Sequence, residues 1–275
     1  MSNTLLQQYG PWALIAGGSE GIGLCFARQL AEAGLNLMLL ARRPEPLQAA
    51  QEQLCRDFSV EVRTHTMDLT AADLEEQLES VTEGIDIGLL IYNAGAIHGA
   101  GLFLDEPLQK TRSLIQLNCL GPAIFSHHLG NRMRQRGRGG ILLMSSLSGL
   151  TGGAYIAAYA ATKAFDIILA ESLWAELKPF GVHVLGLVAG ATDTPAMAAS
   201  GIDFEVGHTM DPAVVANEGL TQLPHGPLRI AGAQNRLGAA ILRGEDRRQS
   251  VALMSAGTAG LYHLPVPDLS TTDMA

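Results

Sequence analysis

The sequence is poor in cysteine, in positive charge and in long apolar runs. Its 275 residues include only three cysteines, Cys25, Cys55 and Cys119. These are too few and too scattered for a disulfide framework or a metal site. We therefore expect reduced, partly buried thiols in a cytoplasmic protein that binds no metal.

The balance of charge disfavours nucleic acid as a partner. The formal net charge is −9, whereas a protein that binds the phosphate backbone needs a basic footprint. One basic cluster is present, formed by Arg132, Arg134, Arg136 and Arg138. We interpret it as the end of a helix, where cations complement the helix dipole.

No run approaches the roughly 18 apolar residues that a membrane span needs. The first residues, MSNTLLQQYGPWALIAGG, lack a basic region followed by a long apolar one, so no signal peptide is expected. With 47% hydrophobic and 16% charged residues, the composition is typical of a soluble globular protein with a large core.

Short apolar runs alternate with helical patterns along most of the chain. The runs cover 12–17, 35–41, 60–68, 87–95, 139–146 and 182–190, and the longest helical patterns cover 105–135 and 154–179. Strands separated by helices imply crossover connections and a parallel sheet that is covered on both faces. We expect an α/β doubly wound parallel sheet that forms a single domain over 1–275.

The pattern changes after Gly190. Residues 191–218 mix Thr, Met, Gly, Asp and Pro without clear periodicity, which predicts an irregular flap over a site. Further on, the segment RQSVALMSAG at 248–257 predicts one late strand.

A glycine-rich stretch, AGGSEGIG at 16–23, follows the first apolar run and opens a helical pattern. Glycine lets the backbone turn sharply and approach a pyrophosphate closely, and the helix start offers N–H groups and a positive dipole end. The spacing is Gly17-x-x-x-Gly21-x-Gly23. A tight turn without any nucleotide is the alternative that this stretch leaves open.

Residues after the next strands favour NADP over NAD. Arg42 stands where an NAD-preferring site usually has an acidic residue, and arginine suits a 2′-phosphate. Two solvated arginines, Arg42 and Arg43, are the alternative. Asp68 could accept from an adenine amino group or cap the following helix. Asn93-Ala94-Gly95 falls at the carboxyl edge of the sheet, where ligands bind in such folds.

Tyr159 and Lys163 are four residues apart in a helical pattern and so share one helix face. A cation beside a phenol favours the phenolate and lowers the tyrosine pKa from about 10. Tyrosine can then act as an acid or base near neutral pH. Tyr155 has no lysine four residues later.

In combination and order, these residues resemble the short-chain dehydrogenase/reductase family, in its single-domain branch. The matching set is the glycine turn, Arg42, Asp68, Asn93-Ala94-Gly95, Asn118, Ser146, Tyr159 and Lys163, within about residues 10 to 195. The resemblance implies a Rossmann fold. The family's active serine lies thirteen residues before the tyrosine, which selects Ser146.

The resemblance also implies a role for each catalytic residue. Ser146 would hold the carbonyl oxygen and Tyr159 would deliver or remove its proton. Lys163 would bind the nicotinamide ribose and depress the tyrosine pKa, and Asn118 would hold a water that relays protons. The nicotinamide itself would supply the hydride.

By the same resemblance, the cofactor is NADP(H), with NAD(H) as the alternative. Its expected contacts are Gly17, Ser19, Glu20, Gly21, Ile22, Gly23, Arg42, Asp68, Leu69, Asn93, Ala94, Gly95, Tyr159, Lys163, Gly190, Thr192 and Thr194. The expected substrate contacts are Ser146, Ser148, Tyr155 and Met197. Two departures from the family pattern are Ala189-Gly190 in place of Pro-Gly and Tyr92 in place of a frequent asparagine.

These features predict an NADP(H)-dependent oxidoreductase that interconverts a hydrophobic ketone and a secondary alcohol. The alternative is an NADP(H)-binding sensor or scaffold without turnover. We expect a small-molecule carbonyl or alcohol substrate, no nucleic acid and no membrane span. The helix at 154–179 is apolar nearly all round, which indicates burial against a partner and hence a homodimer or homotetramer.

Overall fold

The fold is described from a computed structural model, which covers residues 2–95, 99–200 and 209–269. Seven strands form one sheet in the order β3-β2-β1-β4-β5-β6-β7, and every neighbouring pair is parallel. The strands are β1 (Trp12–Ala16), β2 (Asn36–Ala41), β3 (Val62–Thr66), β4 (Ile87–Tyr92), β5 (Gly139–Ser146), β6 (Val182–Ala189) and β7 (Leu228–Ile230). The doubly wound parallel sheet is as the sequence predicts; the assignment of 1–275 to one domain stays a prediction.

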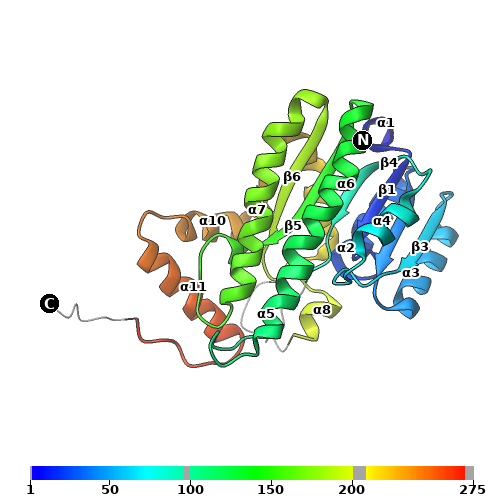
Figure 1. Ribbon diagram of the computed structural model, residues 1–275. Coiled ribbons are helices and arrows are strands. Elements are labelled where there is room, and N and C mark those ends of the chain that lie inside the picture. The colour runs from blue at the N-terminus through cyan, green and yellow to red at the C-terminus, as the bar shows by residue number, and fades with distance from the viewer. Residues whose placement is uncertain (1, 96–98, 201–208, 270–275) are drawn as a thin grey trace.

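Helices cover both faces of this sheet (Figure 1). One face packs against α2 (Gly21–Glu32), α3 (Pro44–Asp57) and α9 (Pro212–Gln222). The other packs against α4 (Leu74–Thr82), α6 (Gly121–Arg136) and α7 (Ala157–Leu177). Because both faces are covered, β1, β4 and most of β5 are buried along their length. This burial explains why these runs show no polar alternation.

The long helical pattern at 105–135 forms two helices with a π-helical segment between them. They are α5 (Leu108–Ile115), the segment Gln116–Leu120, and α6. Pro122 has no N–H to donate to the Asn118 carbonyl four residues earlier, so the α pattern breaks at this point. The Gly121 N–H bonds instead to the Gln116 carbonyl, five residues back.

The late strand predicted at 248–257 is wrong. Those residues lie inside a helix, α11 (Arg247–Leu261), which follows α10 (Ala233–Leu242). Asp246 starts α11 by accepting from the N–H groups of Arg248 and Gln249, an N-cap that the apolar run concealed. The seventh strand is β7, whose three residues are too few to show a strand pattern in the sequence.

The segment expected to be irregular contains more helix than predicted. A short helix, α8 (Pro195–Ala198), lies within it, and α9 begins at Pro212 with Asp211 as its N-cap. Within the described parts of the chain, no helix is long and apolar enough to cross a bilayer, and no cluster of His, Cys, Asp or Glu could hold a metal ion. The three cysteines are free thiols.

The basic cluster closes α6 and ties it to neighbouring segments. Arg136 lies in the last turn and bonds Asp86, at 2.8 Å, and the Gly10 carbonyl. Arg132 donates to the Thr82 carbonyl over 2.9 Å, and Arg138 to that of Gln7. The interpretation of this cluster as a helix end is therefore confirmed.

The first helix, α1 (Ser2–Tyr9), has no clear signal in the sequence. Tyr9 anchors it, with 1% of its surface exposed and its hydroxyl 2.8 Å from His183 Nδ1. A β-carbon at Gly140 would lie 2.7 Å from the Tyr9 ring, and one at Gly88 would lie 2.2 Å from its carbonyl oxygen. Glycines in β4 and β5 therefore make the space in which α1 packs.

We expect Tyr9→Ala to lower the free energy of unfolding by about 3–5 kcal/mol, because it empties a filled site. Tyr9→Phe, which loses only the hydrogen bond to His183, should cost about 1 kcal/mol. Urea unfolding followed by circular dichroism measures both. Thr4→Ala, an exposed change on the same helix, should stay within about 0.5 kcal/mol, and a Tyr9→Ala cost no larger than this would show that α1 is not part of the core.

Candidate active site

The predicted site residues gather at the carboxyl ends of the strands. Gly17 follows β1, Asn93 follows β4, Ser146 ends β5 and Gly190 follows β6. The strand order reverses between β1 and β4, and open α/β sheets bind ligands at such a reversal.

The glycine turn is close-packed and strained for any other residue. Gly17 has φ +79° and Gly21 has φ +54°, in the left-handed region that favours glycine. A β-carbon at Gly23 would lie 1.9 Å from the Gly17 carbonyl oxygen. Asn93 holds the same carbonyl through its Nδ2 at 2.9 Å. The turn therefore brings the start of α2 against the sheet edge.

The start of α2 lacks a side-chain cap, since Glu20 makes none. Glu20 pairs instead with Arg43, which precedes α3. Both Arg42 and Arg43 are exposed, so the second strand delivers two cations next to the glycine turn. The contact between Arg43 and Glu20 has no signal in the sequence, where the two residues are far apart.

Asp68 lies where the third strand leaves the sheet, and it bonds its own loop. Its Oδ1 accepts from the Thr70 N–H at 2.9 Å and from the Thr70 hydroxyl at 2.8 Å. The Thr70 N–H is the main cause that holds the Asp68 pKa below its usual range, and Arg42 adds to the effect. Asp68 does not cap the following helix, because the N-cap of α4 is Asp73; its contact with adenine stays a prediction, and Leu69 beside it is buried.

Strand β5 and helix α7 are joined at the residues that carry the predicted chemistry. Ser145 Oγ donates to the Lys163 carbonyl at 2.7 Å. A β-carbon at Gly149 would lie 2.7 Å from that same peptide group. Ser146 is next to this joint, and its Oγ accepts from the Ser148 N–H at 3.2 Å. Ser145 therefore has a structural role, while Ser146 is half-buried at the strand end.

Lys163 lies inside the protein, where its ammonium has two hydrogen-bond acceptors. It is 5% exposed, and Nζ donates to the Met144 carbonyl at 2.8 Å and to Asp166 Oδ2 at 2.9 Å. A β-carbon at Gly95 would be 3.2 Å from Nζ and 3.5 Å from Asn118 Oδ1. Gly95, Asn118 and Lys163 are thus brought together from three elements.

Asn118 is completely buried in the π-helical segment. Its Nδ2 donates to Thr162 Oγ1 at 3.1 Å, and Thr162 donates to the Tyr159 carbonyl at 2.8 Å. The Tyr92 hydroxyl fixes this segment by donating to the Leu117 carbonyl at 2.7 Å. The departure at Tyr92 therefore supports the segment that carries Asn118.

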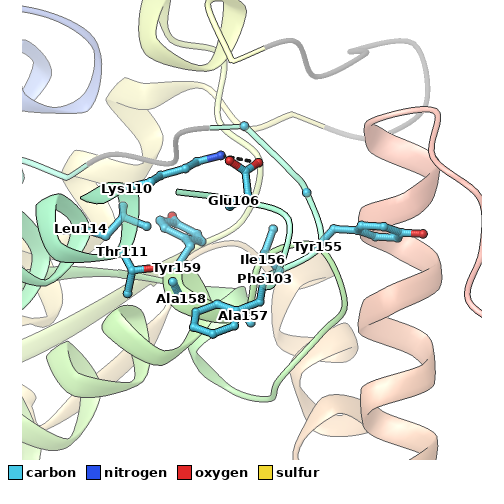
Figure 2. A pocket seen from close by; sticks show the side chains of 12 residues that line it. Phe103, Glu106, Lys110, Thr111, Leu114, Tyr155, Ile156, Ala157, Ala158 and Tyr159 are labelled. Atoms are coloured by element: carbon cyan, nitrogen blue, oxygen red, sulfur yellow. Dashed lines mark ion pairs between the residues drawn. The ribbon is translucent and has the colours of Figure 1, made fainter. Parts of the chain in front are cut away.

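A small cavity of about 30 Å³ lies beside Tyr159. Figure 2 shows the Tyr159 ring next to Lys110, Thr111 and Leu114, which all lie on α5. Lys110 pairs with Glu106 at 2.8 Å. The apolar side chains of Phe103 and Ile156 also line the cavity. The sequence did not identify the residues before and on α5 because they form no motif.

Tyr155 contributes to this cavity without directing its hydroxyl toward Tyr159. Its ring points toward α11 in Figure 2, and its hydroxyl donates to the Pro265 carbonyl at 2.7 Å. Its φ of +70° is in the left-handed region. The substrate contact expected for Tyr155 stays a prediction, and its hydroxyl already has a partner.

The flap places its polar residues near the glycine turn. A β-carbon at Gly21 would lie 3.0 Å from the Thr194 side chain, and Thr194 Oγ1 accepts from the Met197 N–H at the start of α8. Thr192 is buried and donates to the Gly190 carbonyl at 3.1 Å. Met197 is half-buried. Residues 96–98, which follow Gly95, and residues 201–208 of the flap lie outside the described residues.

The C-terminal helix α11 contacts the loop that precedes Tyr159. Tyr262 directly follows α11, and burial raises the pKa of its phenol. The Ser255 hydroxyl accepts from the Ala154 N–H at 2.9 Å. Helix α11 therefore packs on the loop that leads to Tyr159, as Figure 1 shows.

Comparison with known proteins identifies relatives of this chain. A very-long-chain 3-oxoacyl-CoA reductase of Aspergillus clavatus is 36% identical over 199 residues, which are 70% of this chain and 57% of that protein. A 7beta-hydroxysteroid dehydrogenase of Clostridium sardiniense is 30% identical over 232 residues, 84% of this chain and 88% of that protein. A short-chain dehydrogenase from Sphingobium yanoikuyae, solved in complex with NADPH, has a TM-score of 0.76 and 29% identity, over 84% of this chain and 92% of that one.

The family described as short chain dehydrogenase matches residues 11–203. This range includes the glycine turn, Asn118, Ser146, Tyr159 and Lys163, on which the resemblance rests. The chain belongs to the short-chain dehydrogenase/reductase family of oxidoreductases, which act on CH–OH and C=O groups.

Proposed function

We propose that this protein is an NADP(H)-dependent oxidoreductase that interconverts a hydrophobic ketone and a secondary alcohol, with Tyr159 as general acid/base. One observation carries the proposal: Tyr159 lines a cavity between α5 and the start of α7, and Lys163, one turn further along α7, is buried as part of an ion pair. A sensor or scaffold without turnover would need neither group.

The residues present fit a dinucleotide. Gly17 and Gly21 have positive φ, and a β-carbon at Gly23 would lie 1.9 Å from the Gly17 carbonyl oxygen. Glycine at these positions leaves the backbone of the turn without side chains, so a ligand can approach it closely. The uncapped start of α2 can bind a pyrophosphate there. Thr194 lies across the same turn. The remaining contacts proposed at this end are Ser19, Glu20, Ile22, Asp68, Leu69, Asn93, Ala94, Gly190 and Thr192.

Arg42 is proposed to select NADP. It is exposed beside the glycine turn, and no carboxylate stands at its position after β2. The neighbouring Arg43 is paired with Glu20, so Arg42 is the better placed of the two for a 2′-phosphate. The NADPH bound by the Sphingobium yanoikuyae relative supports this preference.

The chain's own residues are proposed to hold the substrate and move its proton. Ser146 Oγ, oriented by the Ser148 N–H, holds the carbonyl oxygen. Tyr159 donates a proton to that oxygen on reduction and removes it on oxidation. The Lys163 ammonium stabilises the phenolate form by its charge. When bound, the nicotinamide supplies or accepts the hydride.

The cavity wall supports a hydrophobic substrate. Phe103, Leu114 and Ile156 line it around Tyr159. The relatives act, by their names, on hydroxysteroids and on very-long-chain 3-oxoacyl-CoA. A bulky ketone of steroid-like or acyl type is therefore the substrate class to test, and Ser148, Tyr155 and Met197 stay the predicted further contacts. The cytoplasmic location also stays a prediction.

We also propose that copies of the chain associate through α7. Ile168 is 61% exposed, and Phe165, one turn earlier, is exposed as well. Leu108 and Ile115 on α5, which packs on α7, expose further apolar surface. An apolar patch that spans two neighbouring helices is typical of an interface, which supports a homodimer or homotetramer.

Tyr159→Phe should lower turnover at least about 100-fold, because it removes the transferable proton. NADPH affinity should change less than about threefold. Tyr155→Phe is the matched control, since its hydroxyl bonds Pro265, and it should keep turnover within about threefold. Loss of NADPH fluorescence with a panel of steroid and aryl ketones measures this. A dead Tyr155→Phe beside an active Tyr159→Phe would reverse the assignment.

Arg42→Ala should weaken NADPH binding about tenfold, because a charge-assisted contact to the 2′-phosphate is lost. NADH binding should stay within about twofold. Arg56→Ala removes the same charge from the far end of α3 and is the control. Fluorescence titration with both cofactors gives the four dissociation constants. Equal losses for NADPH and NADH would exclude the proposed role.

Ile168→Glu should reduce the molar mass of the particle in solution, because it places a charge in the proposed interface. Size-exclusion chromatography with light scattering at micromolar concentration measures the mass. Leu237→Glu, at an apolar position on α10 that is 70% exposed, should leave it unchanged. A wild-type monomer would contradict the proposal.

A further inference from the structure

The amine of Lys163 has a buried anionic partner on its own helix. Asp166 is 2% exposed, and its Oδ2 lies 2.9 Å from Lys163 Nζ. The two residues are three apart on α7, so both point toward β5, where Nζ also meets the Met144 carbonyl. No motif in the sequence singled out Asp166.

Among the described residues around this pair, we find no other carboxylate to balance the amine. The titratable groups that act on the pair from packed elements are Tyr92 of β4, Cys119 of the π-helical segment and Tyr159 of α7. Burial raises the pKa of Cys119 to about 11 and also raises that of Tyr92. Both are therefore neutral at physiological pH, which leaves Asp166 as the counter-ion.

A buried ammonium needs such a counter-ion. Burial alone favours the neutral amine and would lower the Lys163 pKa; Asp166 opposes this, and the net shift is upward. A neutral amine could not favour the phenolate of Tyr159 by its charge. The carboxylate also fixes the direction of Nζ, because it and the Met144 carbonyl take up two of the three donors of the ammonium.

We propose that Asp166 is a positioning residue of the active site, whose carboxylate keeps the Lys163 ammonium charged and holds it between β5 and the π-helical segment. This inference rests on the proposed function of Lys163. Asp166 reaches neither substrate nor cofactor in this role. It acts through the lysine, so it should determine the pH range over which the enzyme works.

The first test is the pH dependence of kcat/KM for alcohol oxidation with NADP+. In Asp166→Asn, the side chain keeps its shape but loses its charge, so Lys163 should lose its proton within the assay range. Activity should then fall about tenfold per pH unit above the new lysine pKa, between about pH 8 and pH 10, where the wild type stays level. Asp166→Glu, which restores the charge, should recover the wild-type shape of the profile.

Glu176→Gln is the matched control, because it removes one negative charge from the exposed side of the same helix. Its profile should follow the wild type. An Asp166→Asn profile parallel to that of Glu176→Gln would overturn the proposal, since an amide would then support the lysine as well as a carboxylate.

A second test needs no turnover and applies even if Asp166→Asn fails to fold. Lys163→Met leaves Asp166 buried without a partner, which destabilises the fold. Adding Asp166→Asn to that variant should raise the urea midpoint, because the unpaired charge is removed. A lower midpoint for the double variant would show that Asp166 supports the fold independently of Lys163, and the proposal would fail.

The two tests separate this inference from the proposed function. If Lys163→Met retains full turnover, the catalytic role of the lysine fails whatever the stability measurements show. If Lys163→Met is inactive but the double variant is less stable than Lys163→Met alone, only the role of Asp166 fails.

Discussion

The contact between α7 and β5 is the constraint on which the proposed chemistry depends. Three interactions fall within one helical turn: Ser145 Oγ to the Lys163 carbonyl, Lys163 Nζ to the Met144 carbonyl, and the approach of Gly149 to the same helix backbone. Ser146 comes from the strand, and Tyr159 and Lys163 come from the helix. Because these hydrogen bonds are directional, they fix the position of α7 along β5 as well as the distance between the helix and the strand. Apolar packing alone would let the helix slide along the strand, since the hydrophobic effect is not directional.

The glycine turn, where the cofactor is proposed to bind, and the residues around Tyr159 and Lys163 are both held by the segment at the end of β4. Asn93, directly after this strand, holds the Gly17 carbonyl of the glycine turn. Two residues later, Gly95 lies so close to Lys163 Nζ that a β-carbon would be 3.2 Å from it, and one would be in ordinary contact with Asn118 Oδ1 at 3.5 Å. Tyr92, at the end of β4, bonds the segment that carries Asn118. One short stretch after a buried strand therefore sets the position of both halves of the site, which explains why glycine and asparagine stand there.

Six of the seven strands and both covered faces could be predicted from periodicity, and the resemblance to the family implied the grouping of Ser146, Asn118 and Lys163. Features that depend on tertiary contacts could not. Helix α11 has strand-like composition, and only the Asp246 cap and packing on the loop before Tyr159 decide its form. Glu106 and Lys110 reach the cavity beside Tyr159 from a segment without local pattern. The pair of Asp166 with Lys163 was also missed, because an acidic residue in a helix is ordinarily exposed.

Burial of that pair follows from the architecture of the fold. A doubly wound sheet is covered on both faces, so a helix that carries reacting groups at its start must continue into the apolar core. Lys163 lies where this transition occurs, four residues after half-buried Tyr159 and five before exposed Ile168. Its ammonium is largely shielded from bulk water there, and a carbonyl alone balances no charge. A carboxylate three residues along the helix is the nearest position that faces the same side. Because the lysine beside Tyr159 must stay charged while it is buried, a carboxylate is needed next to it, and Asp166 supplies that carboxylate.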